Sequence, residues 1–129
     1  MKSLVFVILA LSVIGCKSST EPTSPSIEEE FRLKYGQSVK LKNEPLTIKF
    51  KSIVEDSRCP TGAVCVWEGN AKIVIQVSQQ DVELNSTFEP KEAIYQEYTI
   101  RLLAVNPYPK LNIELKPADY IITLIVTKR

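Results

Sequence analysis

Hydrophobic and polar residues alternate along most of the chain after residue 30. Apolar side chains recur at every second position in eight short segments: 31–35, 39–41, 46–50, 71–77, 82–84, 98–104, 111–115 and 120–126. Turn-forming residues such as Gly36-Gln37 and Asn43-Glu44-Pro45 separate them. A period of two is typical of strands with one buried face and one face in water. We therefore predict an all-β domain, an antiparallel β-sandwich or small barrel of seven or eight strands.

The last two segments are predicted to pair with each other. Leu111, Ile113 and Leu115 would form one strand, which turns through residues 116–119 into the strand 120–126. In that final strand Ile121 and Ile125 make the second face apolar as well. We therefore expect it to lie centrally or under cover. No segment has the periodicity of an amphipathic helix, and no internal repeat is visible.

The first fifteen residues have the pattern of a secretory signal. Lys2 precedes an apolar core at residues 4–14, which is shorter than the roughly 20 residues that span a bilayer. The sequence V-I-G-C, ending at Cys16, resembles the lipobox of bacterial lipoproteins. We expect removal of residues 1–15 and acylation of Cys16 with chains such as palmitate, each buried CH₂ contributing about 0.8 kcal/mol. The alternative is an unmodified thiol buried in the membrane.

Residues 16–30 are predicted to be a polar tether, followed by a single domain at 31–129. The Ser/Thr/Pro-rich run 17–26 would extend up to roughly 30 Å at about 3.1 Å per residue. Residues 26–29 could form either a capping box that opens one helical turn or a solvated acidic run. Lys17, rather than Asp, follows Cys16. This favours the outer membrane and leaves open whether the domain faces the periplasm or the surface.

Charge gives little indication of a partner. The chain has 16 basic and 15 acidic residues, so loss of Lys2 with the signal leaves a formal net charge of zero. Lys and Glu interleave along the predicted strands without forming a basic patch. Nucleic acids and anionic lipid surfaces are therefore poor candidate partners. We expect the lipid on Cys16, and not surface charge, to hold the protein at the membrane.

The unusual residues concentrate in the stretch 56–71, D-S-R-C-P-T-G-A-V-C-V-W-E-G-N-A. It contains Cys59 and Cys65, which we expect to form a disulfide because the signal directs the chain out of the reducing cytoplasm. A metal site is a weaker alternative, since the chain has no histidine and two thiolates do not complete a zinc site. Redox dithiols usually have two intervening residues instead of five. No metal or cofactor is expected.

A polar cluster in the same stretch has two interpretations. In the structural one, Asp56 forms an Asx turn and Arg58 pairs with Glu55, Asp56 or Glu68. In the functional one, carboxylates on opposite arms of the loop bind a cation or act as an acid/base pair. We favour the structural interpretation.

Whether Trp67 is buried can be predicted from its place in the alternating pattern. In an unbroken strand from Cys65 to Val77 it would share a face with Ala71 and Ile73, which predicts a core position beside the disulfide. A bulge at Gly69-Asn70 would reverse the parity and expose the ring for stacking on a ligand. We favour the core position.

The motif D-S-R-C-P-x-G-x-x-C-x-W-x-G-N-A resembles one found in uncharacterised bacterial envelope proteins and lipoproteins. The similarity runs from about residue 36 through the motif to 98–109 and the last strand, and so covers most of the mature domain. The resemblance implies secretion, a disulfide and a β fold, and implies no activity. Glu68 stands where a small residue such as Ala is expected.

The sequence favours a non-catalytic function. It has no histidine, no cysteine left over for nucleophilic work and no phosphate-binding glycine loop, so only a carboxylate-based hydrolase remains as an enzyme class. We expect a lipid-anchored envelope lipoprotein that binds a protein or small ligand through loops at one end of its domain. One alternative is an inhibitor-like module that presents Thr61 and Val64 on the Cys59–Cys65 loop. Another is pairing of an edge strand with a partner's sheet.

Overall fold

The structure is a computed structural model that describes Gly15 and residues 23–129. The predicted signal, the lipidation at Cys16 and most of the tether lie outside the described residues. Within the described part, no helix is long and apolar enough to cross a membrane.

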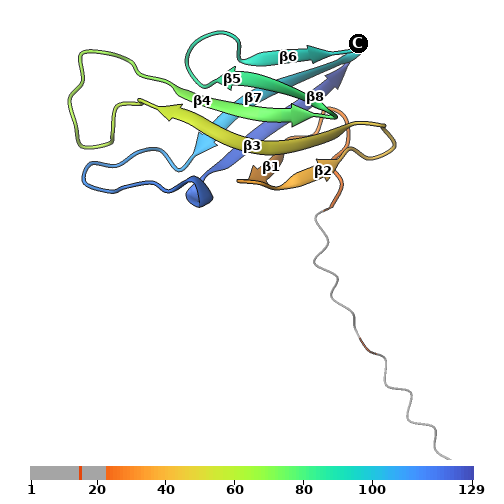
Figure 1. The fold of residues 1–129 in the computed structure, drawn as a ribbon, viewed down its shortest axis with the longest axis horizontal. Helices are drawn as coiled ribbons and strands as arrows, with labels where there is room; N and C mark the ends of the chain where they lie inside the picture. The colour runs from red at the N-terminus through yellow and green to blue at the C-terminus, as the bar shows by residue number, and fades with distance from the viewer. Residues whose placement is uncertain (1–14, 16–22) are drawn as a thin grey trace, which may run out of the picture.

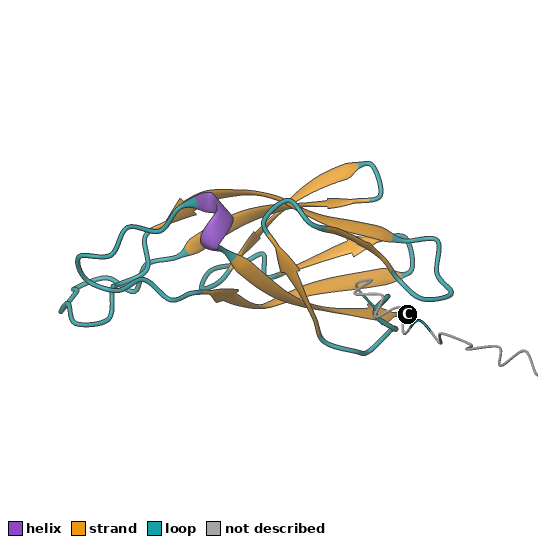
Figure 2. Cartoon of the chain, turned by 90° about the horizontal axis from the view of Figure 1, so that it is seen from below, coloured by secondary structure: helices purple, strands orange, loops and turns teal. Residues whose placement is uncertain are grey.

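The described domain consists of two four-stranded antiparallel sheets packed face to face (Figures 1 and 2). The eight strands are β1 (Phe31–Lys34), β2 (Ser38–Lys40), β3 (Thr47–Asp56), β4 (Ala71–Val77), β5 (Gln80–Asn85), β6 (Glu92–Tyr95), β7 (Tyr98–Asn106) and β8 (Ile121–Lys128). One sheet has the order β1-β8-β7-β6 and the other β2-β3-β4-β5. The sheets do not close on each other. The all-β prediction is confirmed: the domain is a β-sandwich and not a barrel.

The core lies between the sheets and contains the apolar members of the alternating pattern. The residues that are completely buried include Leu33, Leu46, Ile48, Phe50, Ala71, Ile73, Ile75, Val77, Leu84, Ile100, Ile122, Leu124 and Val126. Each comes from a strand or its immediate flank, with polar neighbours facing outward. β8 lies between β1 and β7, which confirms the predicted central position of the last strand.

Two segments differ from the prediction. Residues 111–115 do not form a strand: Leu111 and Ile113 are 50% and 58% exposed, and β8 pairs with β1 and β7 instead. Asn112 has a positive φ of 63°, which an extended strand does not allow, and nearby prolines lack the N–H that a ladder needs. Conversely, β6 was not predicted. It forms a hairpin with β7 through a turn at Gln96, whose φ is 53°.

A register shift in β7 changes which residues enter the core. The pairing with β8 is displaced between Leu102 and Ala104, so Val105 is buried and Ala104 is only half-buried. A bulge adds one residue to a strand and thereby reverses its alternation. The predicted inward position of Ala104 is therefore wrong.

The chain enters the sandwich at the end opposite its longest loops. Pro25 is buried, and its carbonyl accepts a hydrogen bond from the Lys42 backbone at 2.8 Å. The Glu28 backbone donates to Val126 at 2.8 Å, near the C-terminus. These residues, predicted as tether, therefore pack on the domain. Ser26 and Glu29 form a hydrogen-bonded turn without a helix, in which the Ser26 N–H donates to the Glu29 carboxylate at 3.0 Å.

Three loops gather at the opposite end, which we call the loop end: residues 57–70, 86–91 and 107–116. In Figure 1 the first and last of these extend to the left, while the C-terminus and the turn at residues 41–46 lie to the right. In Figure 2, seen from below, long loops again extend to the left and the C-terminus lies to the right. The loop end therefore points away from Pro25, where the chain enters the domain.

Candidate functional site

An ion pair between Asp56 and Arg58 lies at the inner edge of the loop end. Asp56 is the last residue of β3, and the Arg58 side chain is only 5% exposed. The guanidinium Nε and Nη2 atoms donate to the two carboxylate oxygens at 2.8 Å each, a two-pronged geometry that planar guanidinium groups favour. The Arg58 backbone N–H also lies 3.4 Å from Asp56 Oδ1, as the predicted Asx turn requires. Arg58 thus pairs with Asp56; Glu55 and Glu68 form no ion pair among the described residues.

The same two side chains connect the two sheets. Arg58 Nη1 donates to the Val105 carbonyl in β7 at 2.6 Å, and Nη2 donates to the Pro107 carbonyl just after this strand at 3.1 Å. The Tyr108 ring covers the guanidinium, with its centroid 4.8 Å from Cζ. Across the interface, the Tyr120 hydroxyl donates to Asp56 Oδ2 at 2.8 Å. The end of β3 is therefore fastened to the end of β7 and the start of β8.

These contacts change the proton affinities of two groups. Burial by itself raises the pKa of the Asp56 carboxyl, but hydrogen bonds from Arg58 and Tyr120 outweigh it, and the net pKa is below the ordinary value. Burial, together with the hydrogen bond to Asp56, raises the pKa of Tyr120 to about 12. The carboxylate is therefore ionised and the phenol neutral across the physiological range. This state suits a structural fastening of the two sheets.

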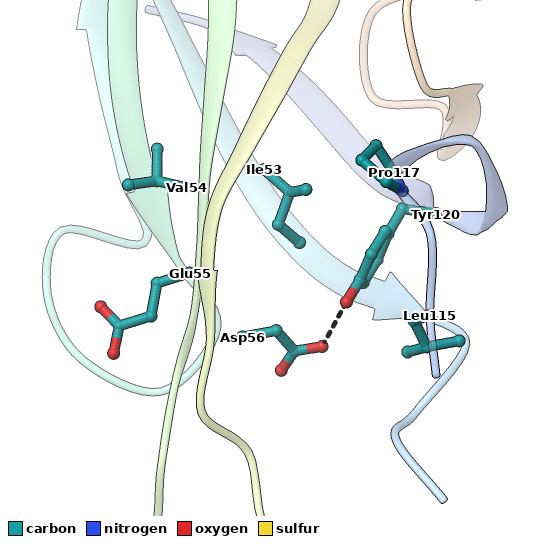
Figure 3. Close-up of a pocket in the computed structure, with 7 residues that line it drawn as sticks. All are labelled: Ile53, Val54, Glu55, Asp56, Leu115, Pro117 and Tyr120. Carbon is teal, nitrogen blue, oxygen red and sulfur yellow. Dashed lines mark hydrogen bonds between the residues drawn. The ribbon is translucent and has the colours of Figure 1, made fainter. Parts of the chain in front are cut away.

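A small hollow of about 140 Å³ adjoins this network. Ile53, Leu115 and Pro117 supply much of its apolar wall, and Asp56 and Tyr120 its main polar groups (Figure 3). The figure shows the Tyr120 hydroxyl directed at the Asp56 carboxylate. Because these two groups are already bonded to each other, the hollow offers little to recognise a polar ligand.

The base of the loop 57–70 is closed by Ser57, Gly69 and Asn70. The Ser57 N–H donates to the Asn70 carbonyl at 2.8 Å, and the Asn70 N–H donates to Ser57 Oγ at 3.0 Å. Gly69 has a φ of +74°, and a Cβ on it would lie 2.1 Å from the Ser57 carbonyl oxygen. Only glycine fits this crossing of the two loop arms.

Asn70 also holds the neighbouring loop, 86–91. Its side chain is buried, donates to Asn85 Oδ1 at 2.8 Å and accepts from the Thr87 N–H at 3.1 Å. Asn85 in turn donates to the Pro90 carbonyl at 3.3 Å. The role of Asn85 was not predicted. The alternation gave no signal for it, because Val82 and Leu84 are the inward positions and Asn85 falls on the polar side with Glu83.

The disulfide and a short bridge organise the outer part of the loop end. Cys59 and Cys65 are bonded, with their Cα atoms 5.9 Å apart, as predicted. Thr61 pairs in parallel with Lys110: its N–H donates to the Pro109 carbonyl at 2.9 Å, and its carbonyl accepts from the Leu111 N–H at 3.1 Å. The loops 57–70 and 107–116 therefore lie side by side. Thr61 and Val64, the predicted contact residues, are both exposed.

Trp67 is not a core residue, so the favoured prediction is wrong. Its side chain is 63% exposed, and Glu68 beside it is exposed as well. The parity argument needed an unbroken strand, but β4 begins only at Ala71 and Gly69 adopts a left-handed conformation. Trp67 therefore belongs to the surface of the loop end.

Large apolar side chains are exposed mainly at this end. Of the eleven that are exposed in the described part of the chain, seven lie in its three loops: Val64, Val66, Trp67, Phe88, Tyr108, Leu111 and Ile113. Val64 and Val66 are fully exposed, at 102% and 96%.

No group of three or more potential metal ligands occurs among residues 15 and 23–129. In the comparisons with known proteins, no family model, curated protein or solved structure matches the chain.

Proposed function

We propose that the protein is a lipid-anchored lipoprotein of the bacterial cell envelope, attached through Cys16 to the outer membrane. Its β domain binds an envelope protein through the loop end and catalyses no reaction. The attachment rests on the signal-like residues 1–15 and the V-I-G-C sequence. The binding role rests on the geometry of the domain.

The observation that carries the binding role is the concentration of exposed apolar side chains in the three loops. Soluble domains rarely leave such groups together at one place unless a partner covers them. The loop end also lies opposite Pro25, where the tether joins the domain. An anchored domain with this polarity presents its apolar loops away from its own membrane.

An inhibitor-like module is the second candidate, and one observation favours it. The segment between Cys59 and Cys65 is held by the disulfide and by the bridge from Thr61 to Lys110, yet Val64 within it is fully exposed. A loop fixed before binding loses little conformational entropy when it enters a cleft.

The anchor is tested by blocking the lipoprotein signal peptidase in cells. An unprocessed precursor should accumulate, and Cys16→Ser should prevent labelling by a fatty-acid analogue. A chain that matures normally under the block would contradict the anchor.

The binding role is tested by placing a photo-crosslinking residue at Val66, with Lys42 at the opposite end as the matched position. Crosslinks to a defined envelope protein should form from Val66 and not from Lys42. Equal crosslinking from both positions, or none from Val66, would contradict binding through the loop end.

A further inference from the structure

The backbone of residues 64–67 is left without internal hydrogen bonds. Within the described part of the chain, none of the N–H or C=O groups of these four residues bonds to the protein. Just before them, the Ala63 N–H donates to the Pro60 carbonyl at 3.0 Å and ends the ordered turn. Backbone polar groups that are to be buried need partners. A protein that covers this segment must therefore supply hydrogen bonds along it.

Both valines of the same segment are exposed. Val64 and Val66 are fully exposed, whereas Cys65 between them is partly buried and turned to its disulfide partner. The backbone bends at Val66 and Trp67, so the segment is not a continuous strand. Neither valine contributes to the core. The segment presents two small aliphatic side chains and a backbone without internal partners, which are features that a peptide-binding cleft recognises.

The first half of the segment is also held in place. The disulfide fixes Cys65, and the bonds of Thr61 to Pro109 and Leu111 fasten the preceding residues to the neighbouring loop. A Cβ on Gly62 would lie 3.7 Å from Leu111 Cβ, so the two loops are in contact there. Because these residues are already held in place, they would lose little conformational entropy on binding.

The position of the Val64–Cys65 peptide bond has a further consequence. This bond lies inside the ring that the disulfide closes. Its hydrolysis would consume one water molecule and leave a Val64 carboxylate and a Cys65 amine, with the S–S bond still joining the two parts. The cut ends would therefore stay together, and a peptidase that cleaved here would not release two products.

The chain's own tether and membrane do not reach this segment. Residues 16–25 span at most about 32 Å when fully extended. The ten residues of β3 alone span about 34 Å, and the loop 57–70 extends beyond them. Because Pro25 docks at the far end, an inverted domain could not lower the segment into the anchoring membrane. The anchoring membrane is therefore not the occupant of this segment.

We propose that residues 63–67 occupy the substrate cleft of an endopeptidase that accepts small aliphatic side chains, with Val64 in its primary specificity pocket. The chain thereby acts as a competitive inhibitor of that enzyme. This deepens the proposed function and rests on it for the place of the loop end in the envelope.

The test uses the full chain, purified in detergent, and two serine endopeptidases: one of the elastase type and one of the trypsin type. Hydrolysis of a small chromogenic peptide by the elastase-type enzyme should be inhibited at micromolar chain concentrations, and that of the trypsin-type enzyme should not. Val64→Asp should weaken inhibition by at least about 30-fold, the effect of a central contact residue. Val64→Arg should transfer inhibition to the trypsin-type enzyme.

Ile94→Asp is the matched control, because Ile94 is a similarly exposed aliphatic residue on β6, outside the loop end. It should leave inhibition unchanged, and circular dichroism should show that every variant is folded. Three results would overturn the proposal: no inhibition of the elastase-type enzyme, inhibition retained by Val64→Asp, or rapid cleavage of the chain as an ordinary substrate.

The result of the inhibition test can be distinguished from a failure of the proposed function. Crosslinks from Val66 to an envelope protein that is not a peptidase would keep the proposed function and overturn this inference. Sedimentation of the unacylated Cys16→Ser chain with phosphatidylethanolamine/phosphatidylglycerol vesicles, lost in Val64→Asp, would assign the segment to a bilayer and overturn both.

Discussion

Replacing Arg58 with alanine should destabilise the domain more than any change to a surface charge. The side chains of Arg58 and Asp56 are 5% and 9% exposed, and the guanidinium makes four hydrogen bonds, two of them to Asp56 and two to backbone carbonyls of β7 and the loop after it. Alanine would leave a buried carboxylate with only Tyr120 as a side-chain donor. Breaking a buried pair in this way costs about 3–5 kcal/mol. Small domains are stable by about 5–15 kcal/mol, so the loss is a large fraction.

The free energy of unfolding is best measured by urea denaturation followed by far-ultraviolet circular dichroism. Fluorescence of Trp67 is unsuitable because the exposed ring reports on the loop end and not on the core. Lys51→Ala is the control. It removes an ion pair with Asp81 in which the side chains are 45% and 47% exposed, and exposed pairs contribute at most about 1 kcal/mol.

A double-mutant cycle separates the ion pair from the other contacts of Arg58. Asp56→Ala and Arg58→Ala should each be costly, while the double variant should cost less than the two losses together, because neither charge is then left buried alone. If Arg58→Ala unfolds within about 1 kcal/mol of the parent chain, the pair does not fasten the sheets, and this account of the motif is wrong.

Four further predictions concern the same end of the domain. Replacing both cysteines of the disulfide with serine should lower the free energy of unfolding by about 2 kcal/mol, measured by the same denaturation, because the closed loop is short. Gly69→Ala should lower the thermal midpoint far more than Gly36→Ala, since both have positive φ but only the Cβ at Gly69 would overlap backbone atoms. The contribution of the Asp56 carboxylate to the free energy of unfolding should be complete above about pH 4, and it should be lost as the pH falls through the lowered pKa of the folded state. Acid unfolding curves of Asp56→Asn should lack this loss. The contribution of Tyr120 should be complete below pH of about 10 and disappear as pH rises through its folded pKa of about 12, and Tyr120→Phe should remove that loss.

The strands were predictable wherever one face of a segment is buried. Segments such as β4, A-K-I-V-I-Q-V, alternate without interruption, and the structure buries the expected residues Ala71, Ile73, Ile75 and Val77. The disulfide was predictable because the signal-like N-terminus predicts export from the reducing cytoplasm and the chain has no histidine to complete a metal site. In both cases a local pattern is enough to decide the outcome.

The errors arose where the outcome depends on contacts distant in sequence. Leu111 and Ile113 have the spacing of a strand, but the backbone there bonds to Thr61 instead of continuing a sheet. Trp67 has the parity of a core residue only if β4 begins earlier than Gly69 allows. The short strand β6 contributes only Ala93 to the buried core, so its sequence gives little periodic signal.

The residues of the motif divide into two groups with different physical roles. Asp56, Arg58, Gly69 and Asn70 are fixed by contacts at the base of the loop, where a change alters the fold. The residues at the outer end, Val64 among them, have no packing that the fold requires. Effects on stability and on binding are therefore expected at different parts of one loop. Changes at the base should lower the free energy of unfolding. Changes at the outer end should alter the affinity for a partner and leave the free energy of unfolding unchanged. The base fixes where the outer end points, so a stretch made mostly of structural residues can still position the proposed binding surface.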